Sequence, residues 1–126
     1  MAVANKFRSN TIPQLFAVVK KNKGTLYIMT YLLPGKSNTV SPSHASDIDL
    51  SRSIQGAGNQ IIRDLSQNTS IALIDIDRSV VAPTNWSAAW FQDHIHPTKI
   101  ANDQIAESTL RHLVSYGELP ISTIQE

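Results

Sequence analysis

The chain has 126 residues, enough for one domain with a hydrophobic core, and 41% of its residues are hydrophobic. Its formal net charge is +1 and its lysines and arginines are scattered, which argues against a nucleic-acid-binding protein. The chain has no cysteine, which excludes disulfides and thiolate chemistry, and no apolar run approaches membrane-spanning length.

The first predicted element is a helix. Residues 1–10 lack the long apolar core of a signal peptide, so the sequence does not indicate a compartment. From Thr11 to Val19 apolar residues recur at helical spacing, with Thr11 as the expected cap. Three lysines followed by Gly24 predict the end of this helix.

The next segments predict a β-α-β unit. The run Thr25–Leu33 is almost continuously apolar, which favours a strand covered on both faces in a parallel sheet. The serine-rich residues 36–53 predict a long surface loop. A second strand is expected at Ser70–Ile76, with a right-handed crossover between the strands. The crossover helix is predicted from an apolar stripe of Ile54, Ala57, Ile61, Ile62 and Leu65.

The remaining residues predict a loop and a final helix. Trp86 and Trp90 lie one helical turn apart and are interpreted as local core under a loop. Thr98 is the expected cap of a helix that ends near Gly117, and residues 117–126 are expected to form a tail. The predicted buried positions of this helix are Ile100, Ile105, Leu110, Leu113 and Val114. Residues 1–126 are thus predicted to form a single domain.

The densest chemistry lies in the run Asp93-His94-Ile95-His96-Pro97-Thr98. Pro97 disfavours helical geometry at His96, and Asp93 is close enough to reach the His96 ring across a tight turn. A carboxylate that holds one imidazole nitrogen leaves the other free as a base, as acyl-transfer enzymes require. The run follows the second predicted strand, on the edge where α/β enzymes bind ligands. The alternative is a polar loop with a capping threonine.

A metal site is a competing interpretation of the same run. His94 and His96 alternate beside Asp93, and alternate histidines with an acid can share a cation. A further ligand would have to come from His44, His112 or a distant acid. We expect no metal and no cofactor.

The block from Asp93 to Thr98, followed by an amphipathic helix, resembles the last conserved block of the SGNH (GDSL-type) hydrolases, an Asp-x-x-His-Pro motif. The resemblance extends loosely back to Thr25 and implies a three-layer α/β/α fold with a flavodoxin-like parallel sheet. It implies a serine esterase, lipase or carbohydrate deacetylase without a metal, acting on an ester or O-acetylated carbohydrate. His96 would be the general base and Asp93 its orienting acid.

Other family blocks are missing. No Gly-Asp-Ser-type block is present, and we assign no serine as the nucleophile. The nearest echo of the family's Gly-x-Asn-Asp block is Val3-Ala4-Asn5-Lys6, which makes Asn5 the candidate oxyanion donor. The serine-rich loop and the two tryptophans are candidates for lining an acyl or sugar pocket. The resemblance covers most of this chain and about half of a full family domain.

The sequence therefore predicts a partial α/β hydrolase fold with a short parallel sheet. Two buried strands make a narrow sheet with an unpaired apolar edge, so we expect a second chain or another copy of this one to complete it. The predicted function is a serine-type ester hydrolase, or the part of one that supplies the Asp–His pair. The alternative is a non-catalytic accessory subunit with a degenerate hydrolase fold.

Overall fold

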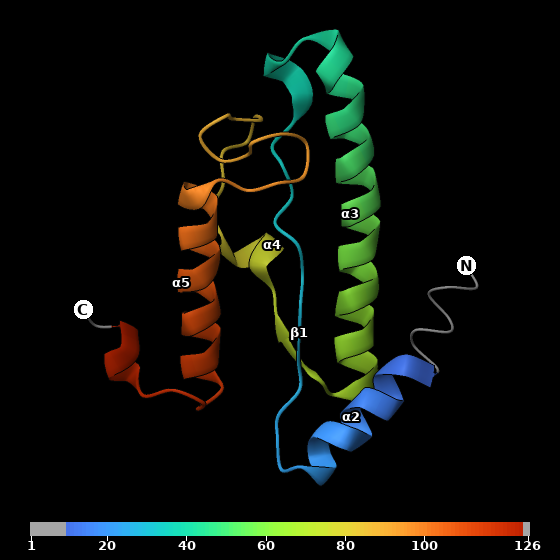
Figure 1. Cartoon of the computed structure of the whole chain (residues 1–126), viewed down its shortest axis with the longest axis vertical. Helices are drawn as coiled ribbons and strands as arrows, with labels where there is room; N and C mark the ends of the chain where they lie inside the picture. The colour runs from blue at the N-terminus through green and yellow to red at the C-terminus, as the bar shows by residue number, and fades with distance from the viewer. Residues whose placement is uncertain (1–9, 125–126) are drawn as a thin grey trace.

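The computed structural model describes residues 10–124, apart from the side chains of Thr39, Pro42 and Ser43. The fold is mixed α/β, mostly helical, around a short parallel sheet of two strands (Figure 1). Within this range no helix is both long and apolar enough to cross a membrane. The elements in chain order are α2 (Ile12–Lys21), β1 (Tyr27–Met29), the 3-10 helix η2 (Ser37–Thr39), α3 (Pro42–Thr69), β2 (Ala72–Ile74), α4 (Ile76–Ser79), α5 (Lys99–Ser115) and the 3-10 helix η3 (Ile121–Ile124).

The predicted parallel pairing of the two strands is confirmed. Tyr27 lies opposite Ala72 and Met29 lies opposite Ile74, with α3 as the crossover. Both strands are shorter than the apolar runs that predicted them. The second strand ends because Asp75 caps α4, its side chain accepting from the backbone N–H of Arg78.

Burial of the first strand on both faces was a wrong prediction. Met29 is 41% exposed and the neighbouring Tyr31 is 63% exposed. Thr30 donates its N–H to Ile74, so the backbone groups of Met29 and Tyr31 point to the opposite, outer edge of β1. This edge has no neighbouring strand among the described residues.

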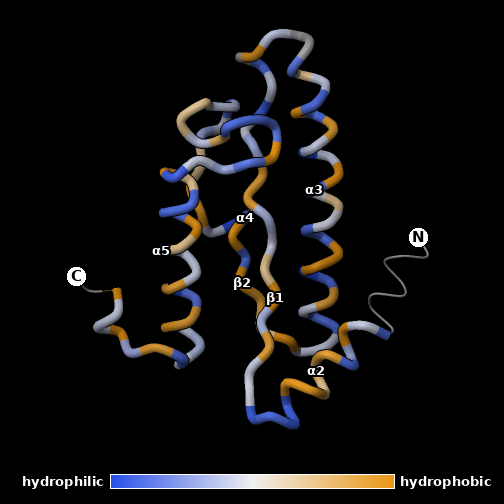
Figure 2. Tube along the Cα trace, viewed as in Figure 1, coloured by the Kyte–Doolittle hydropathy of each residue, from blue (hydrophilic) through white to orange (hydrophobic). Residues whose placement is uncertain are grey.

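The core consists of two apolar clusters on opposite sides of the sheet, since successive strand side chains point to opposite faces. Tyr27 packs on the cluster that faces α5, and Ile28 packs on the cluster that faces α2 and α3. Figure 2 shows these apolar segments meeting along the two strands between α3 and α5. The buried members of the first cluster are Leu32, Ile74, Ile76, Val80, Phe91 and Ala101; those of the second are Ile12, Leu65 and Ile71.

The long loop predicted for residues 36–53 is wrong, because α3 already begins at Pro42. Ser41 occupies the cap position and proline is tolerated in the first turn, so the serine-rich segment starts a helix. Ile48, inside the predicted loop, is only 2% exposed. Conversely, Ile54 from the predicted stripe is 63% exposed, because the buried side of α3 carries Ile48 and Asn59 instead.

The two predicted threonine caps are confirmed in position but not in their side-chain hydrogen bonds. Thr11 and Thr98 occupy the cap positions of α2 and α5, but neither side chain makes a capping hydrogen bond. Thr98 instead donates its Oγ1 hydrogen to the carbonyl oxygen of Ala89. Its side chain therefore fastens the preceding loop rather than the helix.

The buried face of the final helix agrees with the predicted one only in part. Ile100 is 53% exposed and Leu110 is 37% exposed, whereas Ala101 and Ser108 are buried. Ile105 and Leu113 pack on the core as predicted. Small residues face α4 because the two helices approach closely, with 2.7 Å between the hydroxyl oxygens of Ser79 and Ser108. In the predicted tail, the described part contains η3, which lies against α5.

Candidate active site

The predicted contact between Asp93 and His96 is confirmed. Oδ2 of Asp93 lies 2.6 Å from Nδ1 of His96. Oδ1 of the same carboxylate accepts from the backbone N–H groups of Ile95, at 2.8 Å, and His96, at 2.7 Å. The carboxylate is thus fixed by its own turn and holds the imidazole ring by one nitrogen.

Asp93 and His96 lie on a loop of residues 91–97 that is pinched at its base, where Phe91 pairs with Pro97. Gln92 donates its backbone N–H to the carbonyl of His96 at 2.7 Å, and Thr98 donates to the carbonyl of Trp90 at 2.9 Å. Phe91, 1% exposed and part of the core, forms an antiparallel bridge with Pro97. The base of the loop is therefore anchored in the core, while its tip presents the Asp–His pair.

The charge of the pair follows from this geometry. The N–H of Ile95 and the imidazole of His96 hold the pKa of the Asp93 carboxyl well below its usual range. Asp93 is therefore ionised at neutral pH. The His96 side chain is 65% exposed, and no described residue hydrogen-bonds its Nε2 atom. An imidazole held in this way can accept a proton at Nε2.

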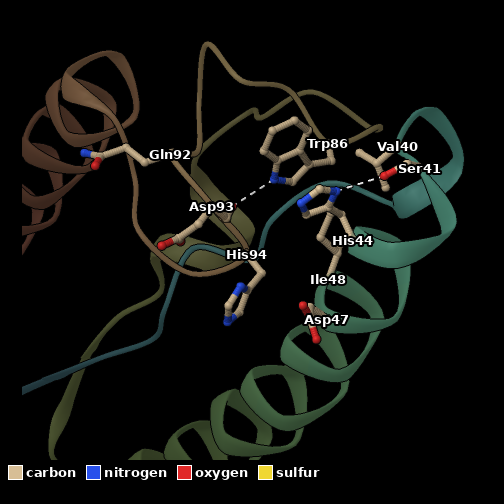
Figure 3. A pocket seen from close by; sticks show the side chains of 9 residues that line it. All are labelled: Val40, Ser41, His44, Asp47, Ile48, Trp86, Gln92, Asp93 and His94. Atoms are coloured by element: carbon tan, nitrogen blue, oxygen red, sulfur yellow. Dashed lines mark hydrogen bonds between the residues drawn. The ribbon is translucent and has the colours of Figure 1, made fainter.

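A cavity of about 460 Å³ lies between the first turns of α3 and the loop that carries Asp93 and His94 (Figure 3). This volume is in the range of small-molecule sites. The Asp93 carboxylate points away from the cavity, whereas His94 faces the α3 side of it (Figure 3). The side chains that line it include Val40, His44, Asp47, Ile48, Trp86 and His94.

His44 and Asp47 belong to the segment 36–53 that was a candidate for lining a pocket, but their placement on one face of a helix was not predicted. Both lay in the segment predicted to be a loop, where side-chain direction has no periodicity. Once residues 42–69 are known to be helical, the spacing of 44, 47 and 48 would have placed these side chains on one face. The two tryptophans behave as predicted, since both pack on the core, and Trp86 also lines the cavity.

The other predicted residues lie apart from the pair or outside the described range. Asn5 lies outside residues 10–124. His112 hydrogen-bonds the carbonyl of Ser108 at 2.8 Å on the last helix. Within the described part of the chain, no three His, Asp or Glu side chains are grouped to hold a metal ion.

None of the serine side chains that the structure describes contacts His96. Ser37 donates to Asp49 at 2.7 Å, and Ser41 lies 2.9 Å from Nδ1 of His44. Ser87 accepts from the backbone of Ala89 at 3.2 Å. The described residues therefore present an imidazole held by a carboxylate, without a serine hydroxyl hydrogen-bonded to it.

The acids at the end of β2 have a structural role instead. Arg63 of α3 binds Asp75 at 2.9 Å and Asp77 at 2.7 Å, and Thr30 donates to Asp75 at 2.9 Å. Burial by itself raises the pKa of Asp75, but the hydrogen bonds from Arg63 and Thr30 outweigh it and lower the pKa overall. This network joins the crossover helix to the carboxyl ends of both strands.

No family model, curated protein or solved structure matches this chain. The resemblance to the SGNH hydrolases therefore depends on the block from Asp93 to Thr98 and on the local geometry described above.

Proposed function

We propose that this chain supplies the general base and the orienting acid of a serine-type ester hydrolase of the SGNH kind. The observation that carries the proposal is the contact between Asp93 and Nδ1 of His96, on a side chain that is 65% exposed. Acyl-transfer enzymes need a carboxylate that selects one imidazole tautomer and leaves the other nitrogen as a base.

In the proposed reaction, Nε2 of His96 takes the proton of a serine hydroxyl as that serine attacks the ester carbonyl. The ionised Asp93 stabilises the imidazolium that forms. The proton then passes to the leaving alcohol, and a water activated by His96 hydrolyses the acyl-serine. Asn5 is the proposed donor to the oxyanion. The scheme uses no metal and no cofactor.

The nucleophile is proposed to come from a second polypeptide, or another copy of this chain, that extends the sheet. The backbone groups of Met29 face the outer edge of β1, and no described residue hydrogen-bonds them there. An extended strand could pair with these groups as far as Tyr31, whose backbone is already bonded to the side chain of Asn59. An added strand would also complete the proposed three-layer, flavodoxin-like fold.

A non-catalytic accessory subunit is the second candidate. It is favoured because the hydrogen bonds described above for Ser37, Ser41 and Ser87 do not involve His96. In that case the Asp93–His96 contact would serve only to stabilise its loop.

Covalent labelling with a fluorophosphonate probe separates the two candidates. We expect labelling of a serine when the chain is mixed with the serine-bearing polypeptide that purifies with it. His96→Ala should reduce the labelling rate by about a thousandfold or more, while His94→Ala, in the same loop, should not. Labelling that is unchanged in His96→Ala would refute the base assignment, and no labelling in any mixture would favour the accessory subunit.

A further inference from the structure

The cavity beside the Asp–His pair has two chemically different walls. Val40, Ile48 and Trp86 form an apolar wall, and His44, Asp47 and His94 supply polar groups on the other sides (Figure 3). Ile48 is 2% exposed and Trp86 packs on the core, so the apolar wall belongs to the folded interior. Such mixed lining is typical of a preformed ligand site.

The aromatic wall is held rigidly. The indole N–H of Trp86 donates to the carbonyl of Asp93 at 3.0 Å, and its backbone N–H donates to the carbonyl of Lys36 at 2.8 Å. Because its edge and its backbone are both fixed, the ring loses little entropy when a ligand packs on it. The same contact ties the cavity wall to the residue that orients His96.

The polar walls offer both acceptors and donors. Ser41 contacts Nδ1 of His44, and the other ring nitrogen points into the space between α3 and the loop (Figure 3). No described residue hydrogen-bonds the carboxylate of Asp47, which lies one helical turn after His44. His94 faces these two residues from the opposite side of the cavity.

The charges of the lining exclude some ligand classes. None of the described lining residues is a lysine or arginine, and the charged ones are carboxylates. Phosphates and carboxylate ligands would therefore meet repulsion without a compensating cation. A fatty acyl chain would leave the polar groups of His44 and Asp47 without partners. A neutral ring with one apolar face and several hydroxyl groups satisfies both walls.

We propose that this cavity binds a neutral sugar unit, the alcohol part of an O-acylated carbohydrate whose ester lies at His96. The location of the ester rests on the proposed function, whereas sugar binding in the cavity does not. Trp86 packs on the ring face, and Asp47, His44 and His94 bind its hydroxyl groups. Asp93 lies between the sugar cavity and the proposed position of the ester. Its carboxylate contacts His96, and its backbone carbonyl accepts from the Trp86 indole.

The test is a titration of the whole chain with xylotriose, cellotriose and chitotriose, followed by amide and indole NMR signals. Trigalacturonate and octanoate serve as acidic and acyl comparisons. We expect at least one neutral oligosaccharide to shift the signals of His44, Asp47 and the Trp86 indole in a saturable way. Shifts with none of the neutral sugars, or only with an acidic or acyl ligand, would overturn the proposal.

Variants locate the site. Asp47→Asn should weaken sugar binding by about tenfold, because a charged hydrogen bond is lost, and Trp86→Phe should weaken it while keeping an aromatic ring. Asp64→Asn, an acid on the same helix outside the cavity, should bind like the wild type. Equal affinity for Asp47→Asn and wild type would place the sugar elsewhere.

The His96→Ala variant separates this inference from the proposed function. His96→Ala should keep sugar binding and lose fluorophosphonate labelling. Sugar binding together with labelling that ignores His96 would uphold the cavity assignment and refute the proposed base. Labelling that requires His96, without sugar binding, would support His96 as the base and refute sugar binding in the cavity.

Discussion

Asn59 pairs with the backbone of Tyr31 as a neighbouring strand would. Its Oδ1 accepts from the N–H of Tyr31 at 2.7 Å, and its Nδ2 donates to the carbonyl of Tyr31 at 2.9 Å. Asn59 is fully buried on α3. One side chain of the crossover helix therefore closes the outer edge of the sheet just beyond β1.

Asn59→Ala should destabilise the chain by about 2–4 kcal/mol, because it leaves a backbone donor and acceptor of Tyr31 without partners. Urea denaturation followed by circular dichroism measures the loss. Asn68→Ala, an exposed position near the end of the same helix, is the matched control and should change stability little. A similar effect from both changes would show that the pairing contributes nothing specific.

Gly35 and Gly58 should respond in opposite ways to alanine. A Cβ atom at Gly35 would overlap the backbone of Asn85 and Trp86, whereas one at Gly58 meets nothing within 4 Å. We expect Gly35→Ala to destabilise by about 1–3 kcal/mol and to shift the Trp86 indole signal. Gly58→Ala should stabilise by about 0.5–1 kcal/mol, since glycine costs that much inside a helix. Thermal unfolding of the two variants measures both effects. Equal stabilities of Gly35→Ala and Gly58→Ala would contradict the close approach of Gly35 to Asn85 and Trp86.

The Arg63 network predicts a loss of stability in acid. The pKa of Asp75 is lowered in the folded chain, so its contribution is present above its ordinary pKa of 3.8 and is lost as the pH falls through the folded value. Arg63→Met should cost about 2–3 kcal/mol at neutral pH, because two half-buried carboxylates lose their cation.

The difference between wild type and Arg63→Met should shrink as the pH falls below 3.8, since a protonated Asp75 carboxyl no longer needs the cation. Melting temperatures measured from pH 6 to pH 3 give both curves. A gap that stays constant with pH would mean that Arg63 acts by packing alone.

Tyr27 should titrate at unusually high pH. Its hydroxyl donates to Oε1 of Glu118 at 2.6 Å; this bond, with burial and the charge of Glu118, raises the pKa of Tyr27 to about 12. The contribution to stability is therefore present below pH 10 and is lost as the pH rises toward 12. An ultraviolet titration should show the ionisation of Tyr27 near pH 12 in the wild type and at a lower pH in Glu118→Gln. The same phase in both proteins would rule out Glu118 as the cause.

Asp93→Asn should change the tautomer of His96. An asparagine can still accept from the backbone at Oδ1, but its amide donates to Nδ1 and leaves the proton on Nε2. Long-range ¹⁵N–¹H spectra at neutral pH should show the Nδ1–H form in the wild type and the Nε2–H form in the variant. His96-dependent labelling should fall by about ten-thousandfold. An Nδ1–H tautomer in the variant would show that Asp93 does not orient the ring.

The Asp93–His96 contact could be predicted from the sequence because it is local: three positions separate the residues, and Pro97 restricts the backbone between them and α5. The parallel pairing followed from two apolar runs joined by a helix. Both arguments need only short-range geometry and hydrophobic pattern.

Other features depended on tertiary structure. Serine content suggested a loop where α3 begins, so the common helical face of His44 and Asp47 was not predicted. Periodicity identified the last helix and only part of its buried face, because Ala101 and Ser108 face the core where helices approach closely. The role of Asn59 depends on its position opposite Tyr31, twenty-eight residues earlier in the chain, which no local pattern indicates.

The pinched loop that carries Asp93 and His96 has a consequence for when the site becomes competent. Contacts between residues so close in sequence form quickly and cost little chain entropy, whereas α3 and the strands must bring together distant segments. The pair can therefore be ready before any added strand docks on β1. In the proposed enzyme, docking of the second chain on β1, and not formation of the Asp93–His96 contact, would then decide when activity begins.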